Sequence, residues 1–333
     1  MSLYPQRRPA TLMLLLATIF WGVSFPTMRA ISLAQERLLP EAGSWFITSI
    51  TVLARFGVAA LLMAIWSWKT LRQLTRLELA QGAGLALFGG AGILLQMDGL
   101  AYTSASTSAF LTQCYCVIIP LIVAWRERRR PSWVIAAGTL MVLTGVAVLA
   151  KIDLRTVKLG RGEWETILAS IVFTGQILWL ERPQYSRNRV DHFSLVMFAG
   201  IALMALPVCL LTMHQPGDLL RAYRAPLVIG LTAILVLACT MVAYLMMNYW
   251  QPRVPATEAG LIYTVEPLFA SLFALFLPEW FASFGGFTYA NEKTTLNLLI
   301  GGGLITAANV LVQLRPAHRP PVSAGPALQA TPS

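Results

Sequence analysis

The chain has 333 residues, of which 56% are apolar and only 12% charged, and its formal net charge is +10. Soluble helices need polar faces, so this composition excludes an ordinary soluble domain and predicts an all-α integral membrane protein. The basic residues are spread along the chain, whereas a nucleic-acid-binding protein gathers them on one soluble face. We therefore expect no nucleic-acid partner.

Apolar stretches, each about the length needed to cross a bilayer, recur along the chain with short polar joints between them. Lipid offers the backbone no hydrogen-bond partners, so each stretch is predicted to form a helix. Only Thr103 and Ser104 separate the third stretch from the fourth, but the combined run is too long for one helix. The ten predicted spans are 11–33, 44–68, 79–102, 105–125, 132–150, 164–181, 192–213, 225–250, 255–278 and 295–314.

The loops between these spans differ in their content of lysine and arginine. One face, which includes both ends of the chain, holds 15 basic residues, and the other holds nine. Lysine and arginine are enriched in cytoplasmic loops, so both termini are expected in the cytoplasm of a bacterial inner (plasma) membrane. The tail at 316–333 is rich in Pro, Ala and Ser and is predicted to be disordered.

The sequence contains an internal duplication. Two pairs of similar segments share an offset of 150 residues: 97–100 with 247–250, and 105–111 with 255–261. Each repeat holds five spans, and an odd number of crossings inserts the second repeat in the opposite orientation. The sequence thus predicts two inverted five-helix repeats, at 10–150 and 163–315, and inverted repeats underlie alternating access in many transporters.

Several short motifs occur in a fixed order along these repeats. They are Phe20-Trp21-Gly22-x-x-Phe25, Arg55-Phe56, Thr103-Ser-Ala-Ser106, Arg126-Glu127, Glu266-Pro267 and Pro278-Glu279. In their order and spacing the chain resembles the EamA-type transporters of the drug/metabolite transporter (DMT) superfamily over roughly residues 10–315. This resemblance implies a ten-helix secondary transporter, commonly an exporter of amino acids, other metabolites or drugs. The first half departs from the pattern, with Cys116-Val117 where the second half has Glu266-Pro267.

Ionisable side chains inside hydrocarbon are costly, so those within spans are candidates for coupling or gating. The four of interest are Arg55, Asp98, Glu258 and Glu266. Asp98 and Glu258 lie near span ends, where an interfacial charge is an equal alternative. Glu266 lies in mid-span, and Pro267 leaves the carbonyl of Tyr263 without its helical partner. We expect a bend there with a carboxylate at its apex, and Pro267 joins the gating candidates; the alternative is a glutamate that packs against a neighbouring helix.

Three roles are open to Arg55, in the second span. It could hold a substrate carboxylate with two parallel hydrogen bonds. It could instead pair with an inner carboxylate to stabilise the fold, or extend to the outer interface. The structural roles are slightly favoured.

Amides and aromatic rings within the spans predict a cavity for an amphipathic organic molecule. The expected substrate-binding residues are Trp21, Gln96, Tyr102, Gln113, Tyr263 and Glu266. The alternative is that many of the rings form interfacial belts or face lipid.

Other chemistry has little support in the sequence. Four cysteines fall inside apolar spans, and Cys114-x-Cys116 has no histidine or carboxylate close by, so no metal site or cofactor is expected. The three histidines are assigned to loops or the tail, which leaves Glu266, Asp98 or Glu258 to carry any coupled protons.

The sequence favours an exporter of amino acids or related small metabolites, with aromatic amino acids as a first guess and a monomer as a sufficient unit. An integral-membrane enzyme acting on lipids and a passive channel are the alternatives; an enzyme is not expected, because no nucleophile or metal motif appears.

Overall fold

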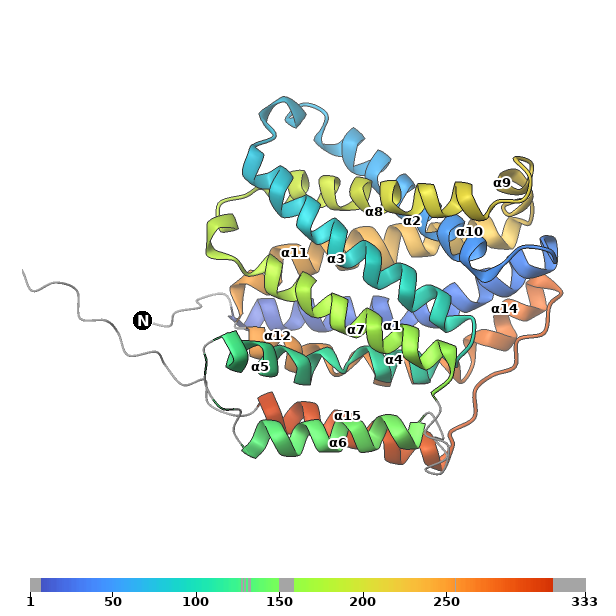
Figure 1. Cartoon of the computed structure of the whole chain (residues 1–333). Coiled ribbons are helices and arrows are strands. Elements are labelled where there is room, and N and C mark those ends of the chain that lie inside the picture. Colours follow the sequence, from blue (N-terminus) through green and yellow to red (C-terminus); the bar gives the residue numbers. More distant parts are fainter. Residues whose placement is uncertain are drawn as a thin grey trace, which may run out of the picture.

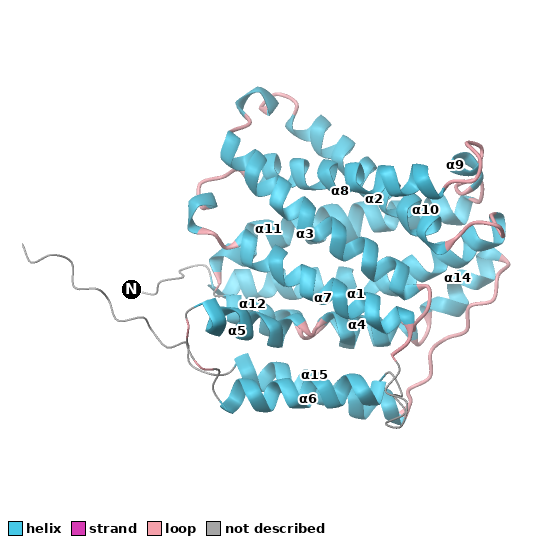
Figure 2. Ribbon diagram, viewed as in Figure 1, coloured by secondary structure: helices cyan, strands magenta, loops and turns pink. Residues whose placement is uncertain are grey.

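The computed structural model of the protein describes residues 7–126, 128, 130, 133–149, 159–254 and 256–313. Every regular element in these ranges is a helix (Figures 1 and 2). The tail predicted to be disordered, at 316–333, lies outside the described residues.

The elements follow the predicted spans closely in chain order. The first half contains α1 (Arg7–Leu38), α2 (Ser44–Ser67), η1 (Leu71–Gln73), α3 (Arg76–Leu100), α4 (Ala105–Thr112), α5 (Tyr115–Arg126) and α6 (Trp133–Leu149). The second contains α7 (Arg161–Leu180), η2 (Pro183–Tyr185), α8 (Val190–Thr212), α9 (Asp218–Arg221), α10 (Pro226–Ile234), η3 (Leu235–Val242), α11 (Ala243–Trp250), η4 (Gln251–Arg253), α12 (Ala256–Tyr263), α13 (Glu266–Ala274), α14 (Leu277–Gly285) and α15 (Leu296–Gln313).

Within the described residues, six helical stretches are long and apolar enough to cross a membrane. They are Arg7–Leu38, Ser44–Ser67, Arg76–Leu100, Ala105–Ile122, Val190–Thr212 and Pro226–Arg253. A seventh is added if α13 and α14, which meet at a 50° bend, form one span. The remaining predicted spans fall on helices that are shorter, bent or more polar. Length and composition therefore establish a multi-pass helical membrane protein, but not all ten spans.

Two of the predicted spans are broken in the middle. The break between α12 and α13 lies at Thr264–Val265, immediately before Glu266 and Pro267, where the missing proline N–H predicts it. The break between α4 and α5 lies at 113–114 and was not predicted, because the nearest proline is Pro120. There the carbonyl of Gln113 accepts a hydrogen bond from Asn309 of α15, at 3.5 Å. A partner on another helix thus stabilises the interrupted backbone.

The main helix pairs join the first half of the chain to the second. α2 lies against α8, and α6 lies against α15 as a separate pair at the edge of the bundle (Figure 1). α3 packs on α7, while α1 packs on η3 and α11. α1 also contacts α12 and α13, as α7 contacts α4 and α5. The two broken spans therefore lie at the centre, between α1 and α7.

Gly22 allows α1 to approach α13 closely. A Cβ at Gly22 would lie 2.7 Å from the Cβ of Phe269 and 2.9 Å from the backbone nitrogen of Ala270. Atoms of the main chain cannot move aside easily, so an alanine here would force the two helices apart. A Cβ at Gly303 in α15, by contrast, would meet nothing within 4 Å.

We expect Gly22→Ala to lower the midpoint of thermal unfolding in detergent by several degrees. Overpacking costs about 1–3 kcal/mol, more than the about 1 kcal/mol that a helical Gly→Ala change contributes. Gly303→Ala is the matched control and should leave the midpoint unchanged or raise it. Equal midpoints for the two variants would contradict close α1–α13 packing.

Candidate substrate-binding site

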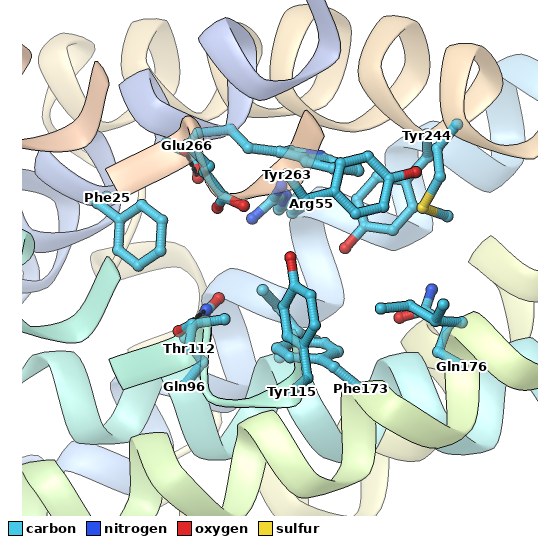
Figure 3. A pocket seen from close by; sticks show the side chains of 15 residues that line it. Phe25, Arg55, Gln96, Thr112, Tyr115, Phe173, Gln176, Tyr244, Tyr263 and Glu266 are labelled. Carbon is cyan, nitrogen blue, oxygen red and sulfur yellow. Dashed lines mark hydrogen bonds between the residues drawn. The ribbon is translucent and has the colours of Figure 1, made fainter. Parts of the chain in front are cut away.

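A cavity lies where α1, α2, α3 and α7 meet α11 and the two broken spans (Figure 3). Its volume is about 70 Å³. We call it the central cavity. Its lining residues are Trp21, Ser24, Phe25, Arg55, Ile93, Gln96, Thr112, Tyr115, Phe173, Gln176, Ile177, Tyr244, Met247, Tyr263 and Glu266. Four of the six predicted substrate-binding residues are among them: Trp21, Gln96, Tyr263 and Glu266.

Glu266 is the first residue of α13 and follows the break in its span directly. Its side chain is 7% exposed, and its Oε2 accepts a hydrogen bond of 3.1 Å from Nε2 of Gln113. Gln113 does not line the cavity, but it lies at the break between α4 and α5, so the two breaks face each other. The N-terminus of a helix also favours a negative charge. Among the described residues no cationic side chain forms an ion pair with Glu266.

Arg55 is buried against the π-helical segment η3, and only 1% of it is exposed. Its Nε donates to Oγ1 of Thr240 at 2.5 Å, and its Nη2 donates to the carbonyl of Cys239 at 3.1 Å. Its Nη1 contacts the sulfur of Met28 at 3.4 Å. These contacts exclude extension to the interface, and no carboxylate of the described residues lies within 4.0 Å. The structural role of Arg55 is therefore to donate hydrogen bonds to the hydroxyl of Thr240 and the carbonyl of Cys239, and not to pair with an inner carboxylate.

Aromatic rings form one wall of the cavity. The ring of Trp21 meets those of Tyr244 and Tyr263 edge-on, with centroids 5.7 Å and 5.5 Å apart. The indole nitrogen of Trp21 is buried and has no hydrogen-bond partner among the described residues. A buried donor without a partner is costly, so this nitrogen is available to a bound molecule.

A hydrogen-bonded layer bounds the cavity on the side of the arginine-rich loops. The hydroxyl of Tyr263 donates to Oε1 of Gln251 at 2.9 Å. Nε2 of Gln251 in turn lies 3.4 Å from Oε1 of Glu181, at the end of α7. We call these three residues the Tyr263 layer.

Asp98 and Tyr102 lie at the far end of α3, in what we call the Asp98 network. Asp98 is fully buried and pairs with Arg161 at the start of α7. Nη1 of Arg161 donates to the hydroxyl of Tyr102 at 2.8 Å, and its Nε donates to Oε1 of Glu165 at 2.8 Å. The Tyr102 hydroxyl also donates to Ser44 at 2.9 Å. The structure thus separates both residues from the central cavity.

Two further predicted positions have different outcomes. Glu258 belongs to α12, but its side chain lies outside the described part of the structure. The assignment of all three histidines to loops or the tail is wrong for His192, which is fully buried in the first turn of α8. Its Nδ1 lies 3.0 Å from Oε2 of Glu78 and its Nε2 lies 3.0 Å from Oγ1 of Thr70. It does not line the central cavity.

The sequence gave no reason to single out several cavity residues. Thr112, which accepts a hydrogen bond of 2.9 Å from Nε2 of Gln96, was missed, as was Phe173. Thr112 ends α4 at the unpredicted break, and Phe173 is one of many apolar residues in its span. Within the described residues no group of three or more metal-ligating side chains occurs.

The described residues form a bundle of apolar helices around a cavity whose walls carry ionisable and aromatic side chains. Residues 8–151 match the model of the EamA-like transporter family, and the resemblance predicted from the motifs is confirmed over this part of the chain. Members of this family are membrane transporters of small solutes, and residues 8–151 of this chain are similar to them.

Other comparisons bear on the fold alone. A solved structure described as "Crystal structure of protein" is 16% identical and has a TM-score of 0.59; the match covers 91% of this chain and 96% of that one. The likeness therefore extends through both halves. The comparison with curated proteins found no match.

Proposed function

We propose that this protein is a secondary transporter of the bacterial inner membrane that exports amino acids or related small metabolites by alternating access. Aromatic amino acids are the first candidates, because rings dominate the cavity wall. The central cavity carries the proposal: it lies between two broken helices, which is where transporters of this general design bind their substrates. In this proposal the chain spans the membrane ten times, both termini are cytoplasmic, and one monomer encloses the pathway.

The packing of the helices supports two inverted five-helix repeats, at 10–150 and 163–315. If α1 corresponds to α7 and α3 to α10–α11, the contact of α1 with η3 and α11 repeats the contact of α7 with α3. Under the same correspondence α2 meets its counterpart α8, and α6 meets its counterpart α15. The helix breaks before Tyr115 and before Glu266 also fall in corresponding spans.

A closed layer lies on each side of the central cavity. The Tyr263 layer separates it from a larger cleft of about 780 Å³, whose lining includes Arg182, Arg189 and Arg253. The Asp98 network joins α2, α3 and α7 at the opposite end. We assign the cleft to the cytoplasmic side and the Asp98 network to the outer side. Opening these layers in alternation is the motion that alternating access requires.

Counterflow in proteoliposomes tests this proposal. Vesicles loaded with a mixture of unlabelled amino acids are offered trace amounts of labelled phenylalanine, tryptophan, tyrosine or leucine. An alternating-access carrier exchanges them, so we expect transient accumulation of label above its equilibrium level. A passive channel would give equilibration without this overshoot. The absence of any flux with amino acids, nucleosides and cationic drugs, by a folded protein, would overturn the transporter proposal.

A further inference from the structure

Two buried ionisable groups, the guanidinium of Arg55 and the carboxyl group of Glu266, line the central cavity, and neither forms an ion pair with another described residue. Arg55 and Glu266 are both lining residues, yet no salt bridge joins them to each other or to any other described residue. An uncompensated charge in a poorly polar region is strongly destabilising. A ligand that carries both an ammonium and a carboxylate would supply a partner of opposite charge for each group.

From this arrangement we infer that the central cavity recognises a zwitterion, a free α-amino acid with both charged groups intact. Glu266 receives the substrate ammonium, Arg55 receives the carboxylate, and the side chain lies among the aromatic rings. The inference rests on the proposed function, and it assigns these two residues as the determinants of substrate specificity.

Arg55 is suited to the carboxylate because its guanidinium is fixed but incompletely used. A guanidinium has five N–H donors, and contacts to Thr240, Cys239 and Met28 account for three of them. The two that remain lie one on each terminal nitrogen. Such a pair matches the two oxygens of a carboxylate, and η3 fixes its orientation beforehand.

Glu266 is suited to the ammonium because its carboxylate has capacity left. Its Oε2 accepts a hydrogen bond from Gln113, and no hydrogen bond to its Oε1 is formed by the described residues. Figure 3 shows the carboxylate of Glu266 and the guanidinium of Arg55 along one wall of the cavity, across from Gln96 and Tyr115. A molecule in the cavity faces both groups at once.

The rest of the wall fits the uncharged part of the substrate. Phe25, Tyr115 and Phe173 line the cavity (Figure 3). Trp21 also lines it, and its indole nitrogen has no partner among the described residues. Rings of this kind bury an aromatic or large aliphatic side chain and pack edge-on or offset against another ring. A small polar amino acid would leave these contacts unmade.

The two charges also exclude molecules that carry only one. An amine without a carboxylate leaves Arg55 uncompensated and places a second cation in the same cavity. A carboxylate without an amine leaves Glu266 without a partner and places a second anion in the same cavity. Losing one partner of a buried charge pair weakens binding strongly, so a zwitterion is expected to bind more than ten-fold better than either singly charged analogue.

Thermal stabilisation of the purified protein in detergent tests this inference. The first ligand series is phenylalanine, 2-phenylethylamine and 3-phenylpropanoate; the second is leucine, 3-methylbutylamine and 4-methylpentanoate. Each series deletes one charge at constant side chain, and ligand binding to the folded state raises its unfolding temperature. We expect stabilisation by the amino acid of at least one series at concentrations more than ten-fold below those that its two analogues need. Equal effects of an amino acid and either analogue would overturn the zwitterion assignment.

Two variants assign the charges to their residues. In the Glu266→Gln protein the carboxylate analogue should stabilise more than the amine analogue. In the Arg55→Gln protein the amine analogue should stabilise more than the carboxylate. Glu279→Gln and Arg72→Gln, at exposed positions, are the matched controls and should keep the wild-type order. Because the wild-type series needs no variant, a folding defect of Arg55→Gln leaves the test decisive.

The same ligands in the counterflow assay separate the two proposals. Counterflow of an amino acid that its singly charged analogues inhibit equally well keeps the transporter and overturns the zwitterion site. Stabilisation by amino acids only, without flux of any solute, keeps the site and overturns the transporter.

Discussion

We expect the Glu266→Gln variant to fold and to show a counterflow rate more than ten-fold lower than that of the wild-type protein. Glutamine keeps the size of the side chain and can still bond to Gln113, so the break between α12 and α13 should persist. The negative charge in the cavity wall is removed, and with it the partner for a substrate cation. The measurement is the initial rate of counterflow of the amino acid that the wild-type protein accepts, at equal amounts of reconstituted protein.

Glu279→Gln is the matched control for this variant. Glu279 lies in α14 of the same half of the chain, and its side chain is exposed. The same loss of charge at this position should leave the rate unchanged. A Glu266→Gln protein that transports at the wild-type rate would show that Glu266 is a helix-packing residue, the alternative that the sequence left open.

The helical bundle could be predicted from the sequence because lipid imposes one dominant constraint. Every backbone polar group must be satisfied within its own segment, so long apolar runs identify helices directly. The same reasoning located the bend before Glu266, since Pro267 removes a helical hydrogen bond at a known position. These predictions depended on chemistry local to a few residues.

Features that depend on contacts between distant segments could not be predicted. The break at 113–114 contains no proline and is accompanied by a hydrogen bond from Asn309, almost 200 residues away in the chain. The π-helical turn in η3 follows no composition signal, yet it supplies the carbonyl of Cys239 to Arg55. His192 was assigned to a loop, but it is buried in α8 and contacts Glu78 and Thr70 from the first half.

In the candidate site, too, local chemistry predicted some residues and misplaced another. Trp21, Gln96, Tyr263 and Glu266 were identified from chemistry alone, because polar and aromatic groups within apolar spans have few other uses. Tyr102 was placed with them, but α3 ends at Leu100 and Tyr102 lies beyond it. Its hydroxyl therefore contacts Ser44 and Arg161 at the end of the bundle, not the cavity.

The Asp98→Asn variant is expected to open the outer side of the protein. Asp98 is fully buried and pairs with Arg161 between the two halves of the chain. Removing one partner of such a pair leaves the other without compensation, which costs roughly 3–5 kcal/mol when both are buried and less here because Arg161 is half-exposed. In the proposed alternating-access cycle only the state closed on the outer side contains the pair, so its loss should shift the population toward a state that is open on that side.

Labelling of a cysteine beneath the Asp98 network measures this shift. Ser108 is fully buried and lies 3.4 Å from Thr166, one helical turn from Thr112 of the central cavity. In Ser108→Cys protein freed of its four native cysteines, an impermeant maleimide added from outside should react at least five-fold faster when Asp98→Asn is present.

Asp191→Asn is the matched control, because it breaks an Arg–Asp pair of 2.9 Å at the opposite end. It should not accelerate labelling, since this pair lies at the end of the protein that we assign to the cytoplasm. An equal or slower rate with Asp98→Asn would show that this network does not close the outer side, and gating would then have to be sought elsewhere along α3 and α7.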